Sequence, residues 1–350
     1  CKDTPTSTEL SKKDITNQDE LEGARLSVWY ELDGKKVYVD KWTSGKDKHM
    51  IKALAVGQEY HMTEEIPADG YVTAKDVVFV VQDTEQVQKV EMVDDVTKTK
   101  ITKTDITTGE LVPGAELEIT DINGKVYAKW TTTNEPYYIE KLPIGEYILK
   151  EKKAPTKDGY VKSEDVKFTV KETGEIQRVE MKDDYTRVEV NKLDVNGNNL
   201  SGAKLKVVNS EGKTVDEWVS DGKPHKMIKL PTGEYTLIEV EPPAGYVTAK
   251  DVEFNITDTN AVQKVGMKDD TTKVKILKVD KDTNKKLENA EFVFKADGSK
   301  TVKVKTNGQG EAKIEGQLVA GKTYVTLGGQ RRPPFLIRVW DGLACRLGQR

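Results

Sequence analysis

The sequence has very few of the residues that cross-link small domains or bind metals. Its 350 residues include two cysteines, Cys1 and Cys345, at opposite ends of the chain, which excludes a disulfide framework within a domain. The three histidines, His49, His61 and His225, share no metal-ligand spacing, so neither a metal nor a cofactor is expected. No run of 18 or more apolar residues occurs, so no membrane-spanning helix is expected.

An excess of positive charge is also absent. The chain has 55 Lys and Arg against 59 Asp and Glu, with the two signs interleaved, which argues against a nucleic-acid partner. Charged residues make up 33% and hydrophobic residues 36%, which favours several small domains with thin cores. Because such domains are marginally stable, we expect side chains other than cysteine to constrain them.

What the chain does have is a repeat of about 90 residues. Each copy opens with a lysine two residues before an aspartate, followed by a Gly-Ala or Asn-Ala step. Three copies also have a Gly-Tyr pair and a closing Met-x-Asp-Asp. The opening pairs are Lys12/Asp14, Lys103/Asp105, Lys192/Asp194 and Lys278/Asp280, and a tryptophan recurs at Trp42, Trp130 and Trp218.

The segments within a copy are typical of β-strands. Short runs rich in Val, Ile, Thr and Tyr alternate with Gly, Asp, Asn and Pro turns, and no segment has a helical period. The sequence therefore predicts an all-β fold in which the short strands of each copy pack as a sandwich.

The repeat predicts the domain boundaries. Complete copies are expected at 6–96, 97–185 and 186–271, with a truncated copy at 272–326. Because Asp3 precedes Lys12 by the same nine residues that separate each closing aspartate from the next lysine, residues 1–5 are expected to be the last strand of a preceding repeat. Residues 327–350 have five arginines and no lysine; we interpret this tail as a frameshift or contig end, with a basic partner-binding tail as the alternative.

Three kinds of charged residue fall on the apolar face of their strands, as judged by the two-residue period. The lysines follow Leu10, Ile101 and Val190 by two residues, and the glutamates and aspartates end similar apolar alternations. The inward residues are Lys12, Glu64 and Asp94 in the first copy, Lys103, Glu151 and Asp183 in the second, and Lys192, Glu239 and Asp269 in the third.

Isolated buried charges are costly, so the three side chains of each copy are expected to meet in the core. They can form a hydrogen-bonded ion cluster, or the amine can react with a carboxyl group to form a neutral amide. Contact between amine and carboxyl would supply the high effective concentration that the reaction needs. The residues alone leave the roles of glutamate and aspartate interchangeable.

These motifs resemble the collagen-adhesin B-type domain, also called the SpaA or prealbumin-like domain, of Gram-positive surface adhesins and pilins. The resemblance covers nearly all of residues 1–326 and includes Lys-x-Asp, the Gly-Ala step, a glycine two or three residues before Tyr-x-x-x-Glu, the Pro-rich turn before Gly-Tyr, and Met-x-Asp. It implies a tandem array of small prealbumin-like (Ig-like) β-sandwich domains.

The resemblance also implies an isopeptide bond in each complete copy: Lys12 to Asp94, Lys103 to Asp183 and Lys192 to Asp269. Glu64, Glu151 and Glu239 would relay protons in a single-turnover reaction, so the chain is not expected to be an enzyme. Where many members end on asparagine and release ammonia, these copies end on aspartate and would release water. The fourth copy has Gly328 where glutamate belongs and no closing aspartate, so we predict no bond and incomplete folding there.

The repetition favours a structural stalk of a cell-wall-anchored, extracellular adhesin or pilin. In that reading, a tip domain outside this sequence would contact host matrix protein or glycan, and a sorting signal outside it would attach the protein to peptidoglycan. The alternative is a module that binds such ligands through loops at the end of a sandwich. A transthyretin-like carrier or hydrolase would need a pocket with shared His, Ser or Cys groups, which the copies lack.

Overall fold

The computed structural model describes residues 4–280, 282–328, 335–340 and 343–347, and it confirms the predicted all-β class. Across these residues the only helical element is a single 3-10 turn, Thr156–Asp158. Helices with the length and apolarity to cross a membrane are absent from this described part. The predictions for Asp3 and for part of the 327–350 tail lie outside the described residues.

The chain divides into two compact units. Unit 1 comprises Cys1–Pro155 and Lys162–Asp184, and it contains the first two repeats apart from one short turn. Unit 2 comprises Thr156–Val161 and Tyr185–Arg350, and it contains that turn and the remaining repeats.

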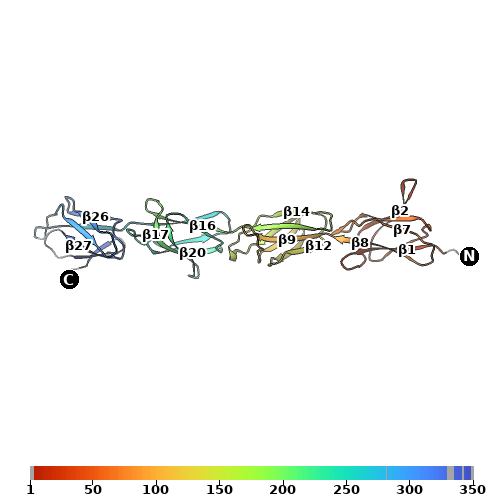
Figure 1. Cartoon of the computed structure of the whole chain (residues 1–350), viewed down its shortest axis with the longest axis horizontal. Helices are drawn as coiled ribbons and strands as arrows, with labels where there is room; N and C mark the ends of the chain where they lie inside the picture. The colour runs from red at the N-terminus through yellow and green to blue at the C-terminus, as the bar shows by residue number, and fades with distance from the viewer. Residues whose placement is uncertain (1–3, 281, 329–334, 341–342, 348–350) are drawn as a thin grey trace. The chain divides into compact units, whose positions relative to one another are not determined.

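The first repeat is a sandwich of two four-stranded sheets (Figure 1). One sheet has the order β4-β1-β8-β6 and the other β3-β2-β5-β7. The strands are β1 (Ser7–Asp14), β2 (Arg25–Leu32), β3 (Lys35–Thr43), β4 (His49–Lys52), β5 (Glu59–Ile66), β6 (Tyr71–Val72), β7 (Val77–Val80) and β8 (Gln88–Val96). Between the sheets lies a core that includes Leu26, Val28, Met62 and Met92.

The second and third repeats keep this plan. Repeat 2 has sheets β12-β9-β15 and β11-β10-β13-β14, and repeat 3 has sheets β19-β16-β22 and β18-β17-β20-β21. The strands of repeat 2 are β9 (Lys98–Asp105), β10 (Glu116–Asp121), β11 (Val126–Thr131), β12 (Tyr137–Glu140), β13 (Gly145–Lys153), β14 (Val166–Val170) and β15 (Ile176–Asp183). Those of repeat 3 are β16 (Arg187–Asp194), β17 (Ser201–Asn209), β18 (Thr214–Asp221), β19 (His225–Ile228), β20 (Gly233–Glu241), β21 (Val252–Ile256) and β22 (Val262–Asp269).

The fourth repeat is folded, so the prediction of incomplete folding is wrong for the described residues. Phe292, Phe294, Ile314 and Tyr324 belong to a buried core of its own. Two late strands extend its larger sheet, in the order β25-β24-β27-β28-β29, opposite the pair β23-β26. The strands are β23 (Lys273–Leu277), β24 (Glu291–Lys295), β25 (Val302–Lys305), β26 (Glu311–Glu315), β27 (Thr323–Gly328), β28 (Phe335–Trp340) and β29 (Leu343–Leu347).

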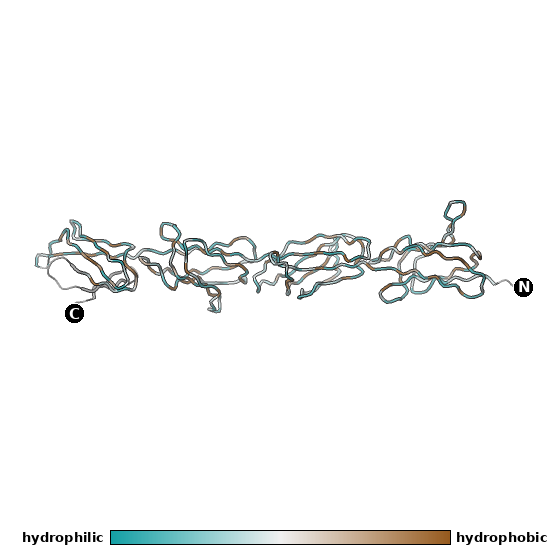
Figure 2. The backbone as a smooth tube through the Cα atoms, viewed as in Figure 1, coloured by the Kyte–Doolittle hydropathy of each residue, from teal (hydrophilic) through white to brown (hydrophobic). Residues whose placement is uncertain are grey.

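Alternation of apolar and polar residues produces these sandwiches. Hydrophobic and hydrophilic positions alternate along the strands of each repeat in Figure 2, as expected when one face of a strand is buried and the other is solvated. In β13, for example, Tyr147, Leu149 and Glu151 are buried, while the residues between them are more exposed. The same alternation that buries leucine thus also buries glutamate.

The recurring tryptophan bridges the two sheets at one edge. Trp42 on β3 stacks on His49 of β4, with ring centroids 4.2 Å apart. Trp130 stacks on Tyr137 at 4.1 Å, and Trp218 stacks on His225 at 4.0 Å. Each pair joins the edge strand of one sheet to that of the other, which covers the core and adds aromatic contact energy.

Within unit 1, repeats 1 and 2 meet through a compact junction. The Thr97 N–H donates to the Gly70 carbonyl at 2.9 Å, and the Lys141 N–H donates to the Thr97 carbonyl at 3.0 Å. Gly70 has φ +86°, and a Cβ there would collide with the Lys141 carbonyl, so only glycine fits without rearrangement. The Asp14 carboxylate accepts hydrogen bonds from the Lys141 ammonium and the Tyr71 hydroxyl.

Candidate functional site

The first and last strands of each complete repeat are neighbours and run parallel. In repeat 1, β1 pairs with β8 so that Lys12 lies opposite Met92 and Asp14 lies opposite Asp94. Lys12 and Asp94 are therefore diagonal neighbours on one face of the sheet, within reach of a long side chain. The Lys12 Nζ contacts the Asp94 Oδ1 directly.

The glutamate of the cluster comes from the opposite sheet. Glu64 lies on β5, and its Oε1 is 2.8 Å from the Lys12 Nζ. The Ala74 N–H donates to the other oxygen, Oε2, at 2.7 Å and holds the carboxyl group in place. The three side chains thus meet between the two sheets, in the core of the sandwich.

The same cluster is built in repeats 2 and 3. The Lys103 Nζ contacts the Asp183 Oδ1 and lies 3.3 Å from the Glu151 Oε1. The Lys192 Nζ contacts the Asp269 Oδ1 and lies 2.8 Å from the Glu239 Oε1. The structure brings all nine residues singled out in the sequence into three clusters, and none of the nine is more than 4% exposed.

Burial raises the pKa of one carboxyl group in each cluster. Desolvation raises the pKa of Asp94 and of Asp269 to about 7, against the lowering effect of the neighbouring lysine. Desolvation likewise raises the pKa of Glu151. In repeats 1 and 3 a protonated aspartate close to the amine is therefore accessible near neutral pH, and in repeat 2 burial favours the protonated form of Glu151.

One oxygen of each aspartate is buried without a hydrogen bond. Among the described residues, the Oδ2 atoms of Asp94, Asp183 and Asp269 have no hydrogen-bond partner, whereas each Oδ1 contacts a lysine. While the aspartate is ionised, an unpaired buried carboxyl oxygen costs about 1–3 kcal/mol or more. A protonated Asp94 or Asp269 can instead share a hydrogen bond with the neighbouring glutamate. Amide formation would retain Oδ1 and remove Oδ2 together with its need for a partner.

The arrangement can support condensation to an amide. The neutral Nζ would attack the Cγ of the protonated aspartate, forming the N–C bond and breaking the bond from Cγ to Oδ2. Two protons would leave with Oδ2 as water, one from the amine and one from the acid. The glutamate would carry a proton between the amine and the leaving oxygen and end in its initial state.

The fourth repeat lacks this cluster. Lys278 is half-buried and lies outside the strands, and no ion pair involving it occurs in the described part of the chain. Gly328 ends β27, at the position that corresponds to the glutamates.

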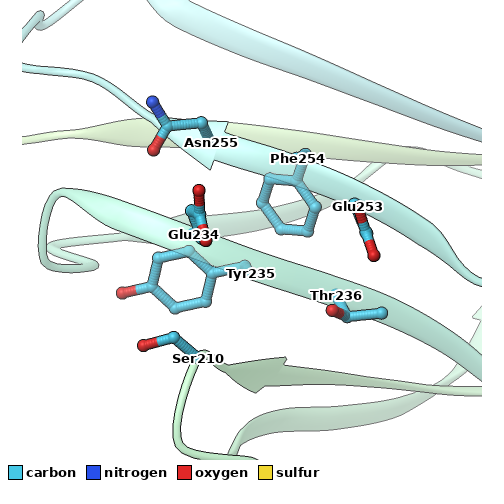
Figure 3. Close-up of a pocket in the computed structure, with 7 residues that line it drawn as sticks. All are labelled: Ser210, Glu234, Tyr235, Thr236, Glu253, Phe254 and Asn255. Atoms are coloured by element: carbon cyan, nitrogen blue, oxygen red, sulfur yellow. The ribbon is translucent and has the colours of Figure 1, made fainter.

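A separate surface pocket of about 420 Å³ lies on repeat 3 (Figure 3). Most of its lining comes from β20 and β21, and the residues are Ser210, Glu234, Tyr235, Thr236, Glu253, Phe254 and Asn255. Ser210, Glu234, Glu253 and Asn255 are exposed, so the pocket has no buried polar group aimed into it from these positions. In the described chain, no group of three or more His, Cys, Asp or Glu residues could hold a metal ion.

A protein-family model matches each of the four repeats. The SpaA domain, described as a prealbumin-like fold domain, matches residues 6–96, 97–185, 186–271 and 272–327. The chain belongs to the SpaA prealbumin-like domain family. It carries this domain in four tandem copies, as the motifs predicted, and the match to the fourth copy agrees with its folded core.

Several solved structures are similar to this chain. The Bacillus anthracis TIE protein is 24% identical over 97% of this chain and 72% of its own, with a TM-score of 0.45. A streptococcal ancillary pilin is 19% identical over 76% of this chain and 99% of its own, with a TM-score of 0.37. BcpA, the major pilin subunit of Bacillus cereus, is 14% identical over 77% and 100%, with a TM-score of 0.35. No curated protein matches the chain at a significant level.

Sequence reasoning missed one member of the second cluster, Ser163. Its hydroxyl accepts a hydrogen bond from the Lys103 Nζ at 2.7 Å. The sequence does contain a signal for Ser163. The corresponding residues of repeats 1 and 3 are Ala74 and Ala249, so repeat 2 has a hydroxyl group where the other two have a small apolar side chain beside the buried charges.

Proposed function

We propose that this chain is a segment of a structural stalk on the surface of a Gram-positive bacterium. It would belong to an extracellular, wall-anchored adhesin or pilin, with each of repeats 1–3 locked by an autocatalytic amide bond. The bonds are Lys12 to Asp94, Lys103 to Asp183 and Lys192 to Asp269, with Glu64, Glu151 and Glu239 as proton relays. The reaction would occur once in each repeat, so the protein would not turn over a substrate.

The observation that carries this proposal is the position of the clusters between the first and last strands. A pulling force on the chain enters repeat 1 through β1 and leaves it through β8. A bond between Lys12 and Asp94 would bypass the 82 residues that separate them in sequence. The sandwich between the two residues would then carry almost none of the load.

Force spectroscopy on the full chain tests this function. In the unmodified chain, repeats 1–3 should contribute no unfolding steps, while repeat 4, which lacks the cluster, should extend. A Lys12→Ala chain should show one added step, because the 82 released residues can extend by about 280 Å. Stepwise extension of all three complete repeats in the unmodified chain would contradict the proposal.

A binding panel addresses the partner. A stalk segment should not bind matrix proteins or glycans, because host contact would be made by a domain outside this sequence. Saturable binding of the full chain to immobilised matrix protein or glycan would favour the ligand-binding module instead, with loops at a sandwich end as the site.

A further inference from the structure

The three clusters differ at one position beside the glutamate. In repeats 1 and 3, the backbone N–H groups of Ala74 and Ala249 each donate to a glutamate Oε2 at 2.7 Å. In repeat 2, Ser163 fills this place, and its N–H donates to the Glu151 Oε2 at 2.6 Å. Only repeat 2 therefore has a hydroxyl group at this point.

The Ser163 hydroxyl lies among the reacting atoms. Besides accepting from the Lys103 Nζ, its Oγ lies 2.6 Å from the Asp183 Oδ1 and 2.7 Å from the Lys182 carbonyl oxygen. A hydroxyl has one proton to donate, so these two oxygens compete for it. Oδ1 is the oxygen that an amide would keep.

We propose that Ser163 is a catalytic residue of repeat 2 that donates its hydroxyl proton in a hydrogen bond to Asp183 Oδ1 while the amide forms. This role rests on the proposed amide bond. Attack by the Lys103 Nζ moves negative charge onto Oδ1, and a hydrogen bond to an anionic oxygen is stronger than one to a neutral carbonyl. The competition would then favour Oδ1 over the Lys182 carbonyl.

The reaction balances with serine unchanged. A neutral Lys103 amine and a protonated Asp183 form the amide and one water, and Oδ2 leaves. Ser163 keeps its proton and stabilises the intermediate, while Glu151 relays the proton to the leaving oxygen. The distance from the Lys103 Nζ to the Glu151 Oε1 is 3.3 Å, against 2.8 Å for the corresponding pairs in repeats 1 and 3. The hydrogen bond from the serine would compensate for slower proton transfer through the more distant Glu151.

The other repeats of the same molecule are internal controls. The full chain can be made by cell-free synthesis, quenched in acidic denaturant at successive times and digested with a protease. Mass spectrometry then measures the cross-linked peptide pair of each repeat, so the rate for repeat 2 is read against repeats 1 and 3. Hydrogen exchange on the finished chains reports whether repeat 2 has folded.

The chains to compare are Ser163→Ala, Ser163→Thr and Ala74→Ser. Removing one donor to an oxyanion commonly slows a reaction by about 10²–10³-fold, so Ser163→Ala should slow bond formation in repeat 2 by at least about tenfold. Ser163→Thr keeps a hydroxyl and should restore most of the rate, and Ala74→Ser should speed repeat 1. Rates in repeat 3 should not change.

The outcomes separate the two proposals. The role of Ser163 is wrong if cross-linked peptides form in all repeats and the bond of repeat 2 forms at least as fast in Ser163→Ala as in the unmodified chain. That result would leave the proposed amide bonds unaffected. If Ser163→Ala fails to fold, the role fails when Ser163→Thr folds but forms its bond at least about tenfold more slowly than unmodified repeat 2, or when Ala74→Ser slows repeat 1. The absence of cross-linked peptides in every repeat of the unmodified chain would overturn the proposed function itself.

Discussion

Replacing the first cluster by uncharged side chains distinguishes a covalent bond from an ion pair. A chain with Lys12→Met, Glu64→Gln and Asp94→Leu keeps the volume of the cluster roughly constant. The glutamine also keeps an oxygen that can accept the Ala74 N–H. If the cluster were only ionic, apolar replacement would be neutral or would stabilise the repeat by about 1–4 kcal/mol. The amide nitrogen of the glutamine loses its neighbours and costs about 1–3 kcal/mol, so little net change is expected.

A covalent bond predicts a large loss of stability instead. The bond would close a loop across 82 residues, and the chain-entropy relation used for disulfides gives about 4.5 kcal/mol for a loop of that length. For a domain of this size, each kcal/mol shifts Tm by roughly 4–8 °C. The Tm of repeat 1 should therefore fall by roughly 20–35 °C.

Differential scanning calorimetry on the full chain measures this change, and hydrogen exchange assigns the shifted transition to repeat 1. Repeats 2 and 3 keep their clusters and act as references in the same molecule. An unchanged or higher Tm for repeat 1 would refute the covalent interpretation and favour an ion cluster.

The junction between repeats 1 and 2 yields two more predictions. Burial alone would raise the pKa of Asp14, but hydrogen bonds from Lys141 and from the Tyr71 hydroxyl outweigh it and hold the pKa well below its usual range. The resulting stabilisation is present above the unfolded pKa of about 3.9 and is lost as the pH falls toward the folded value, so urea unfolding of Lys141→Ala should depend less on pH between about 5 and 2. Gly70→Ala should speed amide exchange at Thr97, because the new Cβ collides with the Lys141 carbonyl. The control Gly34→Ala should not, because Gly34 has a similar φ of +71° but open space around it. Equal exchange at Thr97 in the two chains would contradict the close packing described between repeats 1 and 2.

Local sequence pattern was sufficient for much of the fold and for the composition of the clusters. The period of two placed Lys12 and Glu64 on apolar faces, and both are buried. A single charged residue on an apolar face is weak evidence of a buried site. Its recurrence at the same position in three copies is what indicates the cluster. The domain period followed from the same repetition.

Long-range geometry was beyond that reasoning. The parallel pairing of β1 with β8 joins residues far apart in sequence, and no local pattern specifies which strands become neighbours. The folding of repeat 4 was missed for a related reason. Its larger sheet gains β28 and β29, which come from a segment with no resemblance to the other copies.

Ser163 cannot be predicted from the repeat, because the corresponding residues of the other two complete copies are Ala74 and Ala249. A catalytic group present in one copy only has no period, and its proximity to Lys103 depends on how the loop after β13 packs. The sequence signal for Ser163 is a position that differs between the copies beside positions at which they agree.

The intact mass of the full chain under denaturing conditions tests the central claim most directly. Three amide bonds predict a mass lower than the sequence value by three water molecules, and a Glu151→Ala chain should be lower than its own sequence value by two. A mass equal to the sequence value would contradict the account, because the lysine, glutamate and aspartate side chains of the three clusters would then be in non-covalent contact only.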